Sequence, residues 1–243
     1  MGLALVTGGG RGIGRAVARA LAGAGHRVTV LGRDRAALEA AVAAGDAHEV
    51  AVADVTESGA LRAAVGVAPF DILVNNAGGT ETAPFARTTR AQWDGVLALN
   101  LSAVFDACQA VLPGMAERGR GRVVNVASTA GLVGYPYVAA YVAAKHGVVG
   151  LTRALAREYA ATGVTVNAVC PGFTDTDLVR SSAAAVAAKT GRSGEDVRRA
   201  FAKNNPQGRL VRPEEVADAV LYLCGAGAAA VNGVALAVAG GEV

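Results

Sequence analysis

A serine, a tyrosine and a lysine have the types and spacing that suit acid–base chemistry at an oxygen atom. Tyr141 and Lys145 lie four residues apart in a helix-like stretch, so their side chains would share one helix face. A free phenol has a pKa of about 10, and a neighbouring ammonium group favours the phenolate and lowers that pKa. Ser128 can donate a hydrogen bond to a substrate oxygen and hold a carbonyl group in place. Together the three residues predict proton transfer to a ketone or from a secondary alcohol.

The simpler interpretation of a helical tyrosine and lysine is that they are packed or solvated. Residue usage argues against it, because only Lys145, Lys189 and Lys203 are lysines among 23 basic residues. Arginine could not take the place of Lys145, since a guanidinium group does not release its proton. We therefore expect Lys145 to act on Tyr141.

Seven short runs rich in β-branched residues alternate with longer helix-like segments. The expected strands are Leu3–Thr7, Arg27–Leu31, Glu49–Ala53, Asp71–Asn75, Arg122–Ala127, Thr165–Cys170 and Val234–Val238. Apolar strands joined by helices are typical of a parallel sheet with helices on both faces. We expect a single α/β domain over residues 1–243, a Rossmann-like doubly wound parallel sheet of about seven strands. Such sheets bind ligands beyond the carboxyl ends of their strands, where Ser128 would stand.

The first expected strand leads into a glycine-rich turn and then into a helix. The turn reads Thr7-Gly8-Gly9-Gly10-Arg11-Gly12-Ile13-Gly14, and an amphipathic stretch follows from Arg15 to about Ala24. Glycines let the backbone approach a pyrophosphate, which then sits at the positive end of the helix. Glycine is abundant in this chain, with 32 residues, so the cluster alone would be weak support. Its place between a strand and a helix predicts a nucleotide site.

The TGxxxGxG spacing of this turn resembles the short-chain dehydrogenase/reductase family, and the resemblance extends over essentially the whole chain. Asn75-Asn76-Ala77-Gly78 resembles the NNAG element of the family, and Asp54-Val55 resembles its adenine-contacting pair. Pro171-Gly172 with Thr176 resembles its PGxxxT element, which contacts the nicotinamide end of the cofactor. Ser128, Tyr141 and Lys145 have the spacing of its catalytic residues. The chain is most similar to β-ketoacyl reductases, polyketide ketoreductases and 3-hydroxyacyl-CoA dehydrogenases.

The resemblance implies a fuller set of site residues. It implies that Asn100 is a fourth catalytic residue that supports a water relay behind Lys145; the alternative is a capped or kinked helix position. The cofactor-binding residues that it implies, together with the glycine turn, are Gly8, Arg11, Gly12, Ile13, Gly14, Arg33, Asp54, Val55, Asn76, Ala77, Gly78, Tyr141, Lys145, Pro171, Gly172, Thr174 and Thr176. No histidine or carboxylate cluster indicates a metal site.

The end of the second expected strand bears on the choice of cofactor. Relatives that prefer NAD carry an acid there, which binds the ribose 2′-hydroxyl, whereas this chain has Gly32. Arg33 follows, and Arg11 lies in the glycine turn, so two guanidinium groups could bind a 2′-phosphate. Asp34 lies close enough to complicate this interpretation, and both arginines could be ordinary surface residues. We expect NADP(H) to be preferred, with NAD(H) as the alternative.

Composition narrows the partners and the compartment. The net charge of +3 is small and dispersed, and it does not indicate nucleic acid or a membrane surface. Charged residues interrupt the apolar runs before they reach the roughly 18 residues of a membrane span. Cys108, Cys170 and Cys224 are odd in number and widely spaced, which favours core residues in a reducing compartment. We expect a cytoplasmic protein, and the resemblance implies a homotetramer built on the apolar helices that carry Asn100 and Tyr141.

The substrate is where the alternatives stay open. Residues 178–212 are expected to form a lid over the substrate, and this segment contains eight basic residues against Glu195 and Asp196. A basic lid would attract a phosphorylated carrier, so the leading candidate is a β-ketoacyl thioester linked to CoA or ACP. The segment after the NNAG element, Gly79–Phe85, lacks the Pro-Gly-Gly of polyketide ketoreductases, which does not favour an aromatic polyketide. The alternatives are oxidation of a sugar, sterol or other small alcohol, and, more remotely, a nucleotide-binding sensor without activity.

Overall fold

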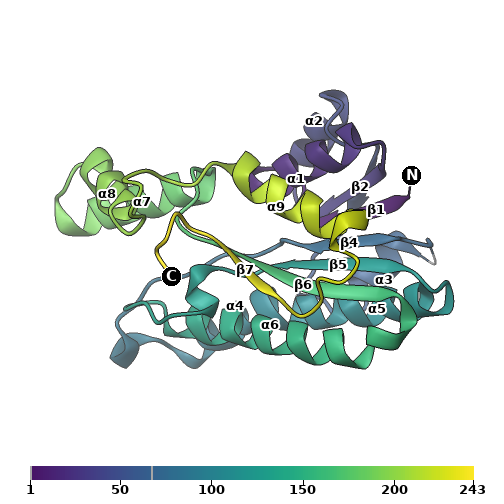
Figure 1. Cartoon of the computed structure of the whole chain (residues 1–243). Helices are drawn as coiled ribbons and strands as arrows, with labels where there is room; N and C mark the ends of the chain where they lie inside the picture. Colours follow the sequence, from purple (N-terminus) through teal and green to yellow (C-terminus); the bar gives the residue numbers. More distant parts are fainter. Residues whose placement is uncertain (1, 67) are drawn as a thin grey trace.

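A computed structural model of the protein describes residues 2–66 and 68–243, and a parallel sheet lies at its centre (Figure 1). Its strands are β1 (Leu3–Thr7), β2 (Arg27–Gly32), β3 (Glu49–Val52), β4 (Ile72–Asn75), β5 (Gly121–Val126), β6 (Val164–Pro171) and β7 (Ala235–Val238). The strand order is β3-β2-β1-β4-β5-β6-β7, and every pairing is parallel. The expected doubly wound sheet is confirmed. The order reverses between β1 and β4, and ligands bind at such a switch point, beyond the carboxyl ends of the strands.

Helices cover both faces of the sheet. They are α1 (Gly12–Gly23), α2 (Arg35–Ala43), α3 (Ala60–Val65), α4 (Arg90–Leu97), α5 (Ala103–Glu117), α6 (Ala139–Glu158), α7 (Asp177–Thr190), α8 (Gly194–Ala202) and α9 (Pro213–Cys224). Helices α1, α2 and α9 lie on one face, and α3, α5 and α6 lie on the other (Figure 1). The first helix begins at Gly12, within the glycine turn, which is three residues earlier than its apolar pattern indicated.

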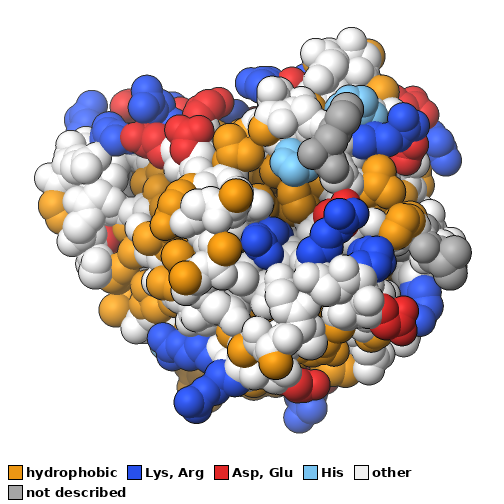
Figure 2. All heavy atoms as spheres, turned by 45° about the vertical axis from the view of Figure 1, so that its right-hand side comes forward, with side chains coloured by type: hydrophobic (Ala, Val, Ile, Leu, Met, Phe, Trp, Pro, Cys, Tyr) orange, Lys and Arg blue, Asp and Glu red, His pale blue; other side chains and the backbone are white. Residues whose placement is uncertain are grey.

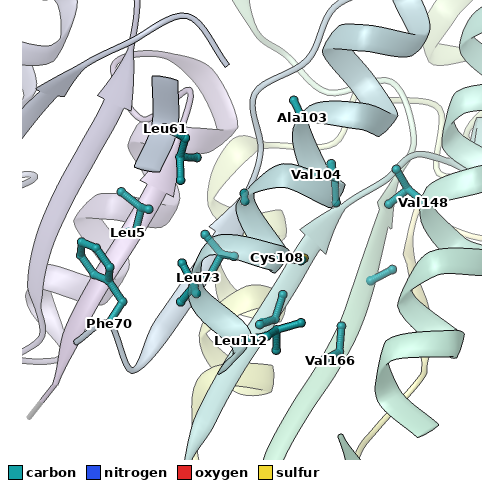
Figure 3. Close-up of a cluster of buried hydrophobic side chains, with 14 of the residues drawn as sticks. Leu5, Leu61, Phe70, Leu73, Ala103, Val104, Cys108, Leu112, Val148 and Val166 are labelled. Carbon is teal, nitrogen blue, oxygen red and sulfur yellow. The ribbon is translucent and has the colours of Figure 1, made fainter. Parts of the chain in front are cut away.

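Each face of the sheet has its own apolar core, since the buried strands send alternate side chains to opposite faces. Figure 3 shows the core under α5 and α6, where Leu73, Leu112 and Val148 come together from a strand and two helices. The cysteines are free and buried, as expected of core residues. Burial raises the pKa of Cys108 and of Cys224 to about 12, so neither is a reactive thiolate at neutral pH.

Contrary to the expectation from the spacing of charged residues, one continuous helix, Arg90–Glu117, is long and apolar enough to span a membrane by length and composition. Within its most apolar window 44% is buried inside the fold, and α5 packs against β4 and β5. Part of the apolar character therefore serves the core of the domain. Between α4 and α5 the helix widens into a π-helical segment at Ala98–Ser102, which contains Asn100.

Helices α7 and α8 stand apart from the layers, beyond the carboxyl end of β6 (Figure 1). They pack mainly on each other, and Phe201 of α8 stacks on Phe173 with ring centroids 4.6 Å apart. The expected lid segment, residues 178–212, covers this helical pair and the connection to α9. On the face shown in Figure 2, basic and acidic side chains are mixed rather than gathered into one charged surface.

Candidate active site

Ser128 lies just beyond the carboxyl end of β5, which ends one residue earlier than expected, at Val126. Its hydroxyl oxygen accepts a hydrogen bond from the amide of Ala130 at 3.1 Å, and a short turn over Thr129–Gly131 follows. Because the oxygen accepts this bond, the hydroxyl proton is left free for another acceptor. The turn holds Ser128 at the edge of the sheet where a ligand is expected.

Tyr141 and Lys145 lie in the first two turns of α6 and face Ser128. The ammonium nitrogen of Lys145 is 5.6 Å from the centre of the Tyr141 ring and donates a hydrogen bond to the carbonyl of Val126 at 2.9 Å. Lys145 is 4% exposed, and burial lowers its pKa to about 8. The structure therefore brings all three predicted side chains together at the end of β5.

The electrostatics of Tyr141 differ from the expectation. Burial raises the pKa of Tyr141, and a hydrogen bond from the Ser128 hydroxyl opposes that rise. We expected the ammonium of Lys145 to lower this pKa, but Lys145 is itself buried and bound to a backbone carbonyl. The loss of hydration thus dominates, and the raised pKa means that the phenol keeps its proton at neutral pH.

Asn100 is fully buried in the π-helical segment and joins the loop after β4 to this site. Its side-chain amide donates to the carbonyls of Gly79 at 2.8 Å and of Val96 at 2.9 Å. Its oxygen accepts the amide of Gly79 at 3.2 Å. A Cβ on Gly78 would lie 2.9 Å from this oxygen and 3.7 Å from the Lys145 nitrogen, so both groups flank Gly78. The structure thus places Asn100 in an irregular helical segment and next to Gly78, which Lys145 also approaches, and its part in a water relay stays a prediction.

The glycine turn leaves the amino end of α1 open. In the described part of the chain, no side chain caps this end, where Arg11 is the flanking residue. Gly14 packs so closely on the carbonyl of Gly8 that any side chain would collide with it. Free amides at a helix start form an anion site, which fits the pyrophosphate of a dinucleotide. Thr176 approaches Gly12 and brings the PGxxxT element to the same place.

The NNAG element is bound to the glycine turn through Thr7, whose position in the network the sequence did not reveal. The Thr7 hydroxyl accepts the amides of Asn76 at 2.9 Å and Ala77 at 3.0 Å. The Asn76 side chain donates to the carbonyl of Thr7 at 3.0 Å. These bonds fix β1 and β4 on either side of the switch point. Its place as the first residue of the TGxxxGxG motif was the one signal in the sequence that could have identified Thr7.

The expected phosphate-binding arginines are both paired with acids. Arg11 forms an ion pair with Asp34, whose carboxylate also accepts the amide of Ala37 and caps α2. Arg33 pairs with Asp54 at 3.4 Å. A hydrogen bond from the Thr56 hydroxyl, with help from Arg33, holds the pKa of Asp54 below its usual value. Both arginines are exposed, Arg33 just beyond β2 and Arg11 at the start of α1, and a 2′-phosphate would have to compete with their carboxylate partners.

Two other expected cofactor residues differ in exposure. Val55 is 8% exposed and belongs to the apolar core, whereas Asp54 is partly exposed. Thr174 is buried, and its hydroxyl donates to the carbonyl of Gly172 at 3.0 Å. The PGxxxT element is thus held by its own internal bonds beside the site.

The lid segment is far less basic than its own sequence indicated. Over residues 175–215, eight basic residues face six acidic ones, because four of the acids lie just outside residues 178–212. The ion pairs among the described residues are Arg180 with Asp175 and Asp177, Arg198 with Asp175 and Glu195, Arg199 with Asp196, and Arg209 and Arg212 with Glu215. The side chain of Lys189 lies outside the described residues. The expected positive field over the site is therefore largely neutralised within the lid itself.

Comparison with known proteins identifies the family. A family model described as short chain dehydrogenase matches residues 2–187. The chain belongs to the short-chain dehydrogenase family. An acetoacetyl-CoA reductase of Rhizobium meliloti is 40% identical, over 99% of this chain and 98% of its own. D-beta-hydroxybutyrate dehydrogenase of Cupriavidus necator is 39% identical, over 99% of this chain and 97% of its own.

A solved structure supports the same assignment. Actinorhodin polyketide ketoreductase with NADPH is 40% identical and superposes with a TM-score of 0.94, covering 99% of this chain and 97% of that one. The protein is thus a short-chain dehydrogenase that acts on keto and hydroxyl groups. The sensor without activity is the alternative that this family membership does not favour.

This short-chain dehydrogenase also has polar residues near the site that the sequence did not reveal. Tyr135, in the loop before α6, is bound to Glu242 from the end of the chain. The two residues are 107 positions apart, and no local motif links them.

Proposed function

We propose that the protein is an NADP(H)-dependent reductase that converts a ketone to a secondary alcohol. In this proposal Ser128, Tyr141 and Lys145 carry the chemistry, with Asn100 behind Lys145. The observation that carries it is the convergence of these side chains at the end of β5, next to the glycine turn. The lysine bond to the Val126 carbonyl, which joins α6 to β5, supports this placement.

Each side chain has a distinct part in the proposed reduction. The Ser128 hydroxyl oxygen is held by the Ala130 amide, and its proton, which is directed to Tyr141 in this structure, would turn to the substrate oxygen when substrate binds. The Tyr141 hydroxyl donates the proton that turns this oxygen into an alcohol, and its raised pKa keeps that proton available. Lys145, with a pKa of about 8, can return a proton to Tyr141 near neutral pH. Asn100 holds the Gly78–Gly79 backbone beside Lys145 and supports a water relay.

NADP(H) would supply the hydride when bound. The open amino end of α1, from Gly12 to Gly14, would hold its pyrophosphate, and Arg11 and Arg33 its 2′-phosphate. Asn76, Ala77 and Gly78, with Asp54 and Val55, would line the remainder of the dinucleotide. Pro171, Gly172, Thr174 and Thr176 would face the nicotinamide end. The NADPH in the related ketoreductase supports this choice of cofactor over NAD(H).

Replacement of Tyr141 by phenylalanine tests the proposed chemistry. Tyr141→Phe removes the proton donor without altering the glycine turn, so turnover should fall by about a thousandfold or more. The Kd of NADPH, measured by fluorescence titration, should stay within about twofold of the parent value. Retention of most of the activity would show that another group donates the proton.

A β-ketoacyl thioester of CoA or ACP is the proposed substrate. The acetoacetyl-CoA reductase relative supports it, whereas the β-hydroxybutyrate dehydrogenase relative favours the alternative, oxidation of a small free alcohol. Because most arginines of residues 178–212 are paired with acids, a basic lid does not support the thioester. NADPH oxidation should be compared for acetoacetyl-CoA, a short β-keto ester and a cyclic ketone, each over a range of salt. Equal kcat/KM for the thioester and the free ketone would contradict the proposed thioester substrate. A preference for the thioester that weakens with salt would indicate that the charges of residues 178–212 help to bind it.

The proposal includes a cytoplasmic homotetramer. Free, buried cysteines support a reducing compartment. The long apolar helix Arg90–Glu117 supports association, because part of its surface lies outside the core of one subunit.

A further inference from the structure

Tyr135 and Glu242 form a polar contact near Ser128 that the proposed chemistry does not use. The Tyr135 hydroxyl lies against the Glu242 carboxylate, and it is 2.8 Å from the hydroxyl of Thr129, the residue after Ser128. A phenol has one proton, and the carboxylate is the stronger acceptor, so Tyr135 donates to Glu242. Thr129 then donates to the Tyr135 oxygen. Burial and the neighbouring Glu242 raise the pKa of Tyr135 to about 12, which keeps the proton on the phenol.

The segment that carries Glu242 is fixed on its other side. A Cβ on Gly172 would lie 2.7 Å from the second carboxylate oxygen of Glu242, so the carboxylate fills the space that the missing side chain leaves. Gly240 has a positive φ of 63° and packs against the buried side chain of Asn205, at the end of the lid. The carboxylate of Glu242 therefore sits between the PGxxxT element and the loop before α6.

The ring of Tyr135 makes a second connection, toward the lid. It packs edge-on against Phe173 with centroids 6.3 Å apart, and Phe173 stacks on Phe201 of α8. One side chain thus contacts the turn after Ser128, the PGxxxT element and the end of the chain. Displacement of Tyr135 would remove the Thr129 bond and loosen the turn that places Ser128.

We propose that Glu242 is a positioning residue: through Tyr135 and Thr129 it fixes the turn that carries Ser128, and it thereby sets the rate of the reaction. The inference rests on the proposed function, because it takes the position of Ser128 to control the rate of the proposed reduction. Glu242 itself would touch no reacting atom. Its action is the hydrogen bond to Tyr135, which an amide oxygen can also accept but an apolar side chain cannot.

Four variants separate this role from general stabilisation: Glu242→Gln, Glu242→Leu, Tyr135→Phe, and the double variant Glu242→Leu/Tyr135→Phe. Glu39→Leu is the matched control, because Glu39 forms an exposed ion pair with Arg35 on α2. Hydrogen exchange of the Ala130–Leu132 amides reports on the turn without any need for activity. Turnover, the Kd of NADPH and the Tm complete the measurements.

Glu242→Leu and Tyr135→Phe should each speed exchange in the turn and lower kcat about tenfold, with the Kd of NADPH within about twofold. Glu242→Gln should keep kcat within about threefold of the parent, and the double variant should be no slower than either single variant. Glu39→Leu should change neither exchange nor kcat. Tyr135→Phe and Glu242→Gln are small changes, so they test the inference even if Glu242→Leu folds poorly.

Unchanged exchange and kcat in Tyr135→Phe would overturn the inference. So would additive losses in the double variant, or a Glu242→Gln variant as slow as Glu242→Leu. Failure of the proposed function is recognised separately, by an active Tyr141→Phe. In that case the exchange measurement would still decide whether Glu242 holds the turn.

Discussion

Lys145 has a cost in stability that follows from its burial. An amine that is 4% exposed, with one hydrogen bond to a carbonyl, has lost most of its hydration. Its pKa falls from 10.5 to about 8, so the charged form is less stable in the folded chain than in the unfolded one. At neutral pH the lowered pKa destabilises the folded state by about 3 kcal/mol, at roughly 1.4 kcal/mol for each pKa unit.

Lys145→Met should therefore be inactive and more stable than the parent at pH 7. The gain should be about 2 kcal/mol, since leaving the Val126 carbonyl unpaired takes back about 1 kcal/mol. The unfolded lysine binds more protons than the folded one between about pH 8 and 10.5, so its contribution to stability rises with pH across that window. In urea unfolding, the free energies of unfolding of variant and parent should differ less at pH 10 than at pH 7. A variant less stable than the parent at pH 7 would contradict this.

Asp34 is the residue expected to limit the preference for NADP(H). Its carboxylate pairs with Arg11 and adds a negative charge close to where the 2′-phosphate would bind. Asp34→Asn removes the charge, and asparagine still caps the start of α2. NADPH should bind about threefold to tenfold more tightly to this variant, with NADH little changed. Titration of both cofactors checks the result, and an equal change for both would mean that Asp34 does not act on the phosphate.

At the scale of single elements, the π-helical segment puts one side chain where a regular helix would not. Asn100 replaces backbone partners for Gly79 and Val96 and so joins the long helix to the loop that carries Gly78. Its hydrogen bond to Val96 is buried and its two bonds to Gly79 are partly buried, and their loss would leave backbone groups unpaired.

Asn100→Leu should destabilise the fold by about 2–4 kcal/mol, because it keeps the volume but removes all three bonds. Turnover should also fall at temperatures where the variant is folded, if the relay behind Lys145 needs this amide. Gln109→Leu is the matched control, since Gln109 is exposed on the same continuous helix. Urea unfolding with turnover measures both effects, and equal stability of the two variants would refute the assigned bonds.

At the scale of the whole molecule, the long helix Arg90–Glu117 leaves apolar side chains outside the core. Phe105 on α5 is 48% exposed, although it lies on a helix whose opposite side is packed against the sheet. A large exposed aromatic residue on an apolar helix favours burial against another subunit.

Light scattering should give a tetramer, and Phe105→Glu should reduce the mass, because it buries a charge in the interface. Ala40→Glu, at an exposed position of α2, introduces the same charge elsewhere and should leave the mass unchanged. A parent protein that stays monomeric at micromolar concentration would rule out the tetramer.

The sequence by itself determined the architecture and most of the site of this protein. Apolar strand runs and helical periodicity are local signals, and they led to seven strands with ends within a residue or two of those found. The TGxxxGxG turn, the NNAG element and the Tyr141–Lys145 spacing are local as well. The carboxyl ends of parallel strands share one edge, so correct strands already bring these motifs together.

Only the tertiary structure decided how charges and polar groups pair. The lid lost its expected positive field because acids just outside residues 178–212 fold back onto its arginines. Asp34 pairs with Arg11 across 23 positions, and Glu242 reaches Tyr135 across 107. Burial raises the pKa of Tyr141, whereas the ammonium of Lys145 was expected to lower it. Ion pairs and desolvation depend on distances of a few ångströms between distant segments, and no spacing along the chain encodes those distances.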